Sequence, residues 1–195
     1  EGGVDGFVIE TMMDVQEARA ALIAVKETCE LFTMVTMTFE RDGRTLNGTD
    51  PLTALVTLQA LGADAVGCNC STGPAEMLPL VRAMEPYARV PLVVKPNAGL
   101  PSLVGGKTVF PMSPEEFSLF GREFVASGVR FLGGCCGTTP AHIGALREKT
   151  AGLAPGERSM PLTGALSSPR KTVVLRQEGP LLIIGERINP TGKKN

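Results

Sequence analysis

Short apolar runs alternate with longer amphipathic stretches along the first 150 residues of the chain. The short runs are rich in β-branched and other apolar side chains, and they predict five strands at residues 6–10, 31–39, 63–69, 91–96 and 129–134. A helix-start signal follows each run, at Asp14, Asp50-Pro51, Pro74, Ser113-Pro114 and Thr139-Pro140. Successive strands begin about 25 to 40 residues apart, which is the size of a βα unit. The pattern therefore predicts an α/β fold built from about five βα units.

Two architectures combine parallel strands and helices in this order. The strands are continuous apolar runs, which favours a parallel sheet covered by helices. Five βα units fit either an open, doubly wound sheet or part of a (β/α)8 TIM barrel. No G-x-G-x-x-G pattern follows the first run, so a dinucleotide-binding sheet has little support. We therefore expect residues 1–152 to form part of a (β/α)8 barrel.

The composition changes after the last predicted helix. Gly, Pro and Ser become frequent and periodicity weakens, which predicts an extended connector at residues 153–179. Two short strand-like runs follow, TVVLR and PLLIIGE, and the second is interpreted as the start of another domain at residues 180–195. Since the chain begins with Glu1 in a loop and ends just after a strand, we expect a fragment of a longer protein.

Composition and charge exclude several classes of partner. The 195 residues carry a formal net charge of −1 without a Lys/Arg cluster, which argues against nucleic acid and anionic membranes as partners. No apolar run approaches the roughly 18 residues of a membrane helix, and no signal-peptide pattern opens the chain. The five cysteines are an odd number and no secretion signal accompanies them, so we expect a cytoplasmic protein whose cysteines serve metal binding or catalysis.

Polar and reactive residues gather where the predicted strands end. Glu10 ends the first run, Asn69 and Cys70 end the third, Asn97 follows the fourth, and Cys135 and Cys136 end the fifth. In a parallel barrel the carboxyl ends of the strands form one face, and active sites lie there. We therefore expect these side chains to surround a single mouth.

The segment GGCCGT at residues 133–138 is the most specific motif. Adjacent side chains normally diverge, and the flanking glycines give the backbone the freedom to aim both thiols at one ion. Together with Cys70, Cys135 and Cys136 would fill three corners of a zinc tetrahedron and leave the fourth open, as in catalytic zinc sites. A thiol that enters the open corner loses its proton and becomes a nucleophile at neutral pH. The motif therefore predicts a zinc enzyme that keeps a thiol substrate nucleophilic.

Several of these residues have a simpler interpretation. Cys68, two residues before Cys70 on the same strand face, could be a fourth ligand of a structural zinc module, although we expect a core position one layer deeper in the barrel. Glu10 could cap the following helix, and Asn69 could hydrogen-bond the loop. Asn97 could be only a turn residue. His142 is expected to be solvated or to cap the last helix.

The motifs resemble those of a known family. VGCNCSTGP at residues 66–74 and FLGGCCGTTPAHI at residues 131–143 resemble the homocysteine S-methyltransferase barrel. FVIETMMDVQEA at residues 7–18 is similar to the fourth strand of that barrel and the start of its next helix. IIGERINPTGKK at residues 183–194 resembles the opening of the pterin-binding domain of cobalamin-dependent methionine synthases.

The resemblance implies a function for these residues. It implies the last five units of the barrel, zinc on Cys70, Cys135 and Cys136, and homocysteine as the substrate. Glu10 would bind the amino group of homocysteine, and Asn69 is assigned with it as a substrate-binding residue. Methylcobalamin, bound by a domain outside this chain and remade from methyltetrahydrofolate, would donate the methyl group. Alternatives are a cobalamin-independent homocysteine S-methyltransferase and the structural zinc module. We expect the fragment alone to be inactive.

Overall fold

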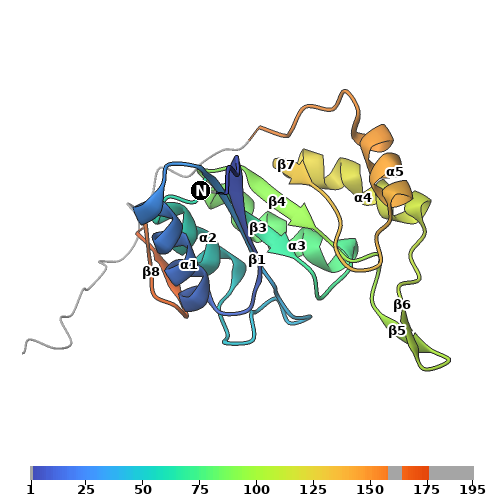
Figure 1. Ribbon diagram of the computed structural model, residues 1–195, viewed down its shortest axis with the longest axis horizontal. Helices are drawn as coiled ribbons and strands as arrows, with labels where there is room; N and C mark the ends of the chain where they lie inside the picture. Colours follow the sequence, from blue (N-terminus) through green and yellow to red (C-terminus); the bar gives the residue numbers. More distant parts are fainter. Residues whose placement is uncertain (1, 158–163, 176–195) are drawn as a thin grey trace, which may run out of the picture.

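The computed structural model describes residues 2–157 and 164–175 of the chain. Within these residues, five parallel strands form one sheet: β1 (Gly6–Met12), β2 (Phe32–Met37), β3 (Ala65–Asn69), β4 (Leu92–Lys95) and β7 (Val129–Leu132) (Figure 1). The helices are α1 (Val15–Thr28), α2 (Pro51–Ala60), α3 (Pro74–Met84), α4 (Pro114–Ala126) and α5 (Pro140–Thr150), and the 3-10 turn η1 (Glu85–Tyr87) extends α3. All five predicted strands and helices are confirmed.

The helices begin where the local sequence predicts. Asp14 caps α1, because its side chain accepts a hydrogen bond from the backbone N–H of Gln16 at 2.9 Å. Ser113 and Glu116 form a reciprocal capping box at the start of α4. In the described part of the chain, every helix is too short or too polar to span a lipid bilayer.

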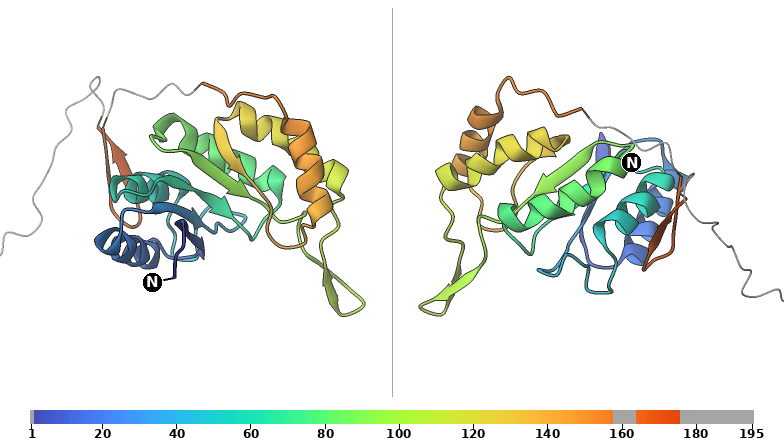
Figure 2. Two further views of the ribbon diagram at one scale, coloured as in Figure 1. Left: turned by 45° about the horizontal axis from the view of Figure 1, so that its top comes forward. Right: turned by 180° about the vertical axis from the view of Figure 1, so that it is seen from behind.

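The sheet is wound in one direction only. Its strand order, β1-β2-β3-β4-β7, follows the chain. Each of the helices α1 to α5 contacts the next one along the chain, so they lie side by side on one face of the sheet (Figure 2). A doubly wound sheet reverses its strand order and carries helices on both faces. The alternative of an open, doubly wound sheet is therefore excluded.

The main core lies between the sheet and these helices. Its fully buried side chains come from the helix-facing positions of the strands and from the apolar stripes of α1, α2 and α3: Leu22, Val35, Met37, Leu55, Leu58, Val66, Met77, Val81 and Leu92. Burial of this apolar surface is the main stabilising contribution to the fold.

The opposite face of the sheet is concave. The rings of Phe32 on β2 and Phe131 on β7 have centroids 5.9 Å apart, although β3 and β4 separate their strands. Lys95 on β4 likewise forms an ion pair with Glu10 on β1. We call this the inner face, and its exposed apolar side chains include Val8 at 57% and Phe32 at 42% exposure. Side chains of non-adjacent strands can meet in this way only if the sheet curves.

Two β-hairpins were not predicted. Strands β5 (Ser102–Val104) and β6 (Lys107–Val109) pair antiparallel and project from the body of the molecule (Figure 1). Strands β8 (Ala165–Ser167) and β9 (Thr172–Val174) form a second hairpin inside the predicted connector, and β9 coincides with the expected TVVLR strand. The predicted domain start at 180–195, with its PLLIIGE strand, lies outside the described residues.

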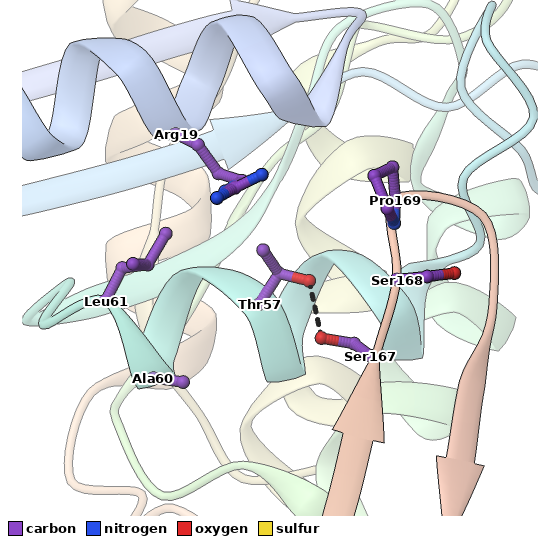
Figure 3. A pocket seen from close by; sticks show the side chains of 7 residues that line it. All are labelled: Arg19, Thr57, Ala60, Leu61, Ser167, Ser168 and Pro169. Carbon is purple, nitrogen blue, oxygen red and sulfur yellow. Dashed lines mark hydrogen bonds between the residues drawn. The ribbon is translucent and has the colours of Figure 1, made fainter. Parts of the chain in front are cut away.

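The hairpin β8–β9 lies against α2 through hydroxyl groups. Thr172 Oγ1 donates to Thr53 Oγ1 at 3.0 Å, and the hydroxyls of Thr57 and Ser167 are 2.9 Å apart. A cavity of about 220 Å³ between this hairpin and helices α1 and α2 is lined by Arg19 among others (Figure 3). The part of the connector at residues 164–175 is thus held on the outside of the helical layer.

Candidate metal centre

Three cysteines converge at the carboxyl ends of β3 and β7. The Sγ atoms of Cys70, Cys135 and Cys136 all lie within 4.8 Å of one another, and those of Cys70 and Cys136 are 3.8 Å apart. Cys70 follows β3, whereas the adjacent pair follows β7, on the far side of β4. Three sulfur donors from two separate turns can therefore hold one metal ion.

An unusual backbone conformation aims Cys70 at this cluster. Cys70 and Ser71 both have a φ of 64°, in the left-handed region that non-glycine residues rarely adopt. Each such residue costs about 1–3 kcal/mol, which the surrounding structure must offset. The Cys70 N–H donates to the Lys95 carbonyl at 3.2 Å, and the Thr72 N–H donates to the Cys70 carbonyl at 2.8 Å. These bonds fix the turn that presents the thiol.

The same turn separates Cys70 from Cys68. Cys68 is 1% exposed and lies in the core between the sheet and the helices, so the prediction that it is a buried core residue is confirmed. The expectation that it shares a face with Cys70, one layer deeper inside the barrel, is wrong. Side chains alternate along β3, but the left-handed conformation at Cys70 ends this alternation. Burial raises the pKa of the Cys68 thiol to about 12.

The loop after β4 holds the turn that carries the other two thiols. The Cys135 N–H donates to the Pro96 carbonyl at 2.8 Å, and the Cys136 N–H donates to Asn97 Oδ1 at 3.1 Å. Asn97 is 3% exposed. Its side chain therefore positions the turn that carries Cys135 and Cys136, a role beyond the turn residue that the sequence indicated.

Asn69 connects three strands beneath the cysteines. Its Oδ1 accepts hydrogen bonds from the Thr11 N–H at 2.9 Å and from Thr36 Oγ1 at 2.7 Å. Its Nδ2 donates to Thr11 Oγ1 at 2.8 Å and lies 3.8 Å from Cys135 Sγ. Thr11 has a φ of 61°, which is a strained conformation for a β-branched residue. Asn69 therefore stabilises this conformation through hydrogen bonds to strands β1 and β2 and not to the loop that was its alternative partner, while its contact with substrate stays a prediction.

Glu10 lies on the inner face at the carboxyl end of β1. The register of β1 with β2 shifts between Ile9 and Met12, and such a bulge re-aims side chains. The Glu10 carboxylate accepts a hydrogen bond from the Lys95 ammonium. Since Asp14 caps α1, Glu10 does not have the capping role that was its alternative.

His142 caps α5 but is not solvated. The Thr139 N–H donates to its Nδ1 at 3.2 Å, and its Nε2 is 3.0 Å from the Met112 carbonyl, to which it donates. The residue is 6% exposed. Its two nitrogens are thus engaged in structural hydrogen bonds away from the cysteines.

The environment of Cys136 favours the protonated form of its thiol. Desolvation, followed by the neighbouring Cys70 and Cys135 thiols, raises the pKa of Cys136 to about 11, even though this side chain is largely exposed. A metal ion that binds Cys136 must therefore displace the proton of this thiol, which makes the affinity for the metal dependent on pH.

Comparison with known proteins places the chain in a family. The model of the homocysteine S-methyltransferase family matches residues 1–150. The chain belongs to this family. It is 35% identical over 200 residues to a methionine synthase from Mycobacterium tuberculosis (strain H37Rv) and 36% identical over 205 residues to one from Mycobacterium leprae. Both matches cover the whole chain but only 17% of the relative, so the chain spans about a sixth of these proteins.

Solved structures of this family share the fold. A homocysteine methyltransferase from Escherichia coli in its metallated form superposes with a TM-score of 0.63 at 24% identity, covering 75% of this chain and 46% of that one. Its oxidized form gives a TM-score of 0.61 at 26% identity. These values support the same strand and helix arrangement in this member of the homocysteine S-methyltransferase family.

The roles of some residues of this family member emerge only from the structure. Lys95 donates a hydrogen bond to Glu10, and Asn97 accepts one from the Cys136 N–H. Thr11 and Thr36 donate hydrogen bonds to Asn69. Lys95 and Asn97 stand at the end of a predicted strand, which was an available signal. Thr36 lies inside an apolar run, away from the end of its predicted strand, so its position did not indicate a role in the site.

Proposed function

We propose that this chain is the thiol-activating part of a zinc-dependent homocysteine S-methyltransferase of the methionine synthase type. The observation that carries the proposal is the convergence of Cys70, Cys135 and Cys136 at the carboxyl ends of two strands. Zinc, when bound there, would lower the pKa of a substrate thiol and keep its sulfur nucleophilic at neutral pH. The product of methyl transfer to homocysteine is methionine.

The donor set suits zinc. Tetrahedral zinc–thiolate sites have metal–sulfur bonds of about 2.3 Å, so their sulfurs lie about 3.8 Å apart. The Sγ atoms of Cys70 and Cys136 are 3.8 Å apart. The description of the E. coli homocysteine methyltransferase as metallated further supports a metal in this family.

The position of Cys68 argues against the structural zinc module. That module needs a fourth protein sulfur, and among residues 2–157 and 164–175 the metal-competent cluster contains three cysteines. Cys68 is buried in the helix-facing core. Three protein ligands with a fourth open position are the arrangement of catalytic zinc sites.

The inner face supplies the groups that would bind the amino acid part of the substrate. Glu10 is 52% exposed at its side chain and lies at the same end of the sheet as the thiols, where its carboxylate can bind the homocysteine ammonium. Asn69 holds the Cys135 thiol and the end of β1 together, and we assign its amide to the substrate site as well. Both residues would orient the substrate so that its thiol reaches the open metal position.

The remaining parts of the enzyme would lie outside the described residues. We propose that residues 1–152 are the last five units of a (β/α)8 barrel, because strands in chain order and the exposed apolar inner face both suit a barrel wall. Residues 153–179 would link it to a pterin-binding domain that starts at 180–195. A further domain would bind methylcobalamin, the methyl donor. A cytoplasmic location stays a prediction.

One observation favours an enzyme of the methionine synthase type over a cobalamin-independent homocysteine S-methyltransferase. The family match ends at residue 150, whereas the matches to the methionine synthases cover the whole chain. The segment after the barrel units therefore also resembles methionine synthases.

Substitution of single cysteines in the full-length protein tests the proposal. Cys135→Ser should strip zinc and abolish methyl transfer from methylcobalamin to homocysteine, because it removes one of three thiolate ligands. Cys68→Ala is the matched control and should keep both zinc and activity. Full zinc occupancy in the Cys135→Ser protein, measured by metal analysis, would contradict the ligand assignment.

A further inference from the structure

Lys95 is a cationic side chain at the mouth of the inner face. It ends β4, and its Cα pairs in register with that of Asn69. Its side chain is 19% exposed, and its ammonium forms an ion pair with Glu10 across the two intervening strands. A lysine held this far inside a sheet mouth is unusual, since lysine side chains are mostly solvated.

The backbone and stem of Lys95 adjoin both cysteine turns. Its carbonyl accepts a hydrogen bond from the Cys70 N–H at 3.2 Å. A Cβ atom built on Gly133, just before the Cys135-Cys136 turn, would lie 3.2 Å from Lys95 Cγ. Glycine at this position therefore leaves room for the lysine stem. The residue joins the metal-facing turns to the Glu10 carboxylate.

An amino acid substrate presents two opposite charges to such a mouth. Homocysteine carries an ammonium and a carboxylate at neutral pH, and both lose water when the substrate binds. Glu10, as assigned in the proposed function, accounts for the ammonium alone. The carboxylate needs a cationic or N–H donor of its own, and a charge-assisted hydrogen bond provides the strongest such contact.

We propose that Lys95 binds the α-carboxylate of the amino acid thiol. Without substrate, Lys95 and Glu10 neutralise each other. On binding, the substrate inserts its zwitterionic group between them, so that its ammonium pairs with Glu10 and its carboxylate with Lys95. This inference rests on the proposed function, and it makes the pair a selector for α-amino acid thiols.

Three small-molecule thiols can distinguish carboxylate binding by Lys95 from a purely structural role of this residue. Homocysteine has both charges, 4-sulfanylbutanoate has only the carboxylate, and 3-aminopropane-1-thiol has only the ammonium. Binding to the full-length zinc protein is measured by titration calorimetry. Lys95→Met should weaken homocysteine and 4-sulfanylbutanoate about tenfold or more and leave 3-aminopropane-1-thiol unchanged. Lys95→Arg should restore much of the lost affinity, because it keeps the charge.

The matched control is Lys26→Met. Lys26 has a similarly covered side chain, 22% exposed, and is also ion-paired, but with Asp64 between α1 and β3. This variant should bind all three thiols like the wild type. If Lys95→Met instead weakens the amine thiol as much as homocysteine, Lys95 only positions Glu10 and the carboxylate contact is refuted.

Wild-type binding provides a test that does not depend on any variant folding. The carboxylate contact requires wild-type protein to bind homocysteine about tenfold or more tightly than 3-aminopropane-1-thiol. Equal affinities would overturn it even if Lys95→Met lost its zinc. If the zinc-loaded wild type binds none of the three thiols, the proposed function itself fails.

Discussion

Asn69→Ala tests which hydrogen bonds stabilise the strained end of β1 beside the cysteine cluster. The substitution removes the acceptor of two donors, the Thr11 N–H and the hydroxyl of Thr36, which is fully buried. An unpaired buried donor costs about 1–3 kcal/mol, so the two together should destabilise this region by about 2–6 kcal/mol. Thr36→Val is the matched comparison. It removes one hydroxyl and leaves Asn69 bonded to Thr11, so its cost should be about 1 kcal/mol.

Amide hydrogen exchange in the full-length protein measures the local destabilisation at the end of β1 for each of the two variants. Each 1.4 kcal/mol is a tenfold change, so amide exchange at the end of β1 should accelerate by at least about thirtyfold in Asn69→Ala. Thr36→Val should accelerate it by only about fivefold. If Asn69→Ala exchanges no faster than Thr36→Val, the amide does not hold the left-handed conformation of Thr11.

Two further predictions concern stability. Gly67→Ala should destabilise the protein by about 3 kcal/mol or more, because the new Cβ would lie 1.8 Å from the Val93 carbonyl oxygen, whereas Gly144→Ala, in open space, should not; chemical denaturation compares them. Burial would raise the pKa of Asp64, but Lys26 and the Thr33 N–H lower it below 3.8 overall. The contribution of Asp64 to the free energy of unfolding is therefore present above about pH 4 and lost as pH falls through the folded-state pKa. Asp64→Asn should then cost up to about 1 kcal/mol at pH 7 and less at about pH 3. A cost for Asp64→Asn that is the same at both pH values would contradict this.

The strands, helices and cysteine convergence follow from local features of the sequence. Capping residues and prolines mark the helix starts, and a parallel sheet places all strand ends on one side. From that rule alone, Cys70 and the Cys135-Cys136 pair were expected to meet, and their sulfurs lie within 4.8 Å of one another.

Features that depend on dihedral angles or on long-range pairs could not be predicted. Whether Cys70 shares a face of the sheet with Cys68 depends on the positive φ of Cys70, and non-glycine residues give little sign of such a conformation. The Glu10–Lys95 pair joins residues 85 positions apart and requires curvature of the sheet. The hairpin β5–β6 is made of two three-residue strands, which are too short to show a strand period, and its apolar side chains Leu103, Val104 and Val109 are exposed.

X-ray absorption at the zinc edge of the full-length protein tests the central claim most directly. The account predicts three sulfurs and one oxygen or nitrogen around zinc without substrate, and four sulfurs after addition of homocysteine. Four sulfurs before homocysteine is added, or a coordination shell that homocysteine leaves unchanged, would contradict a three-cysteine site that activates a thiol.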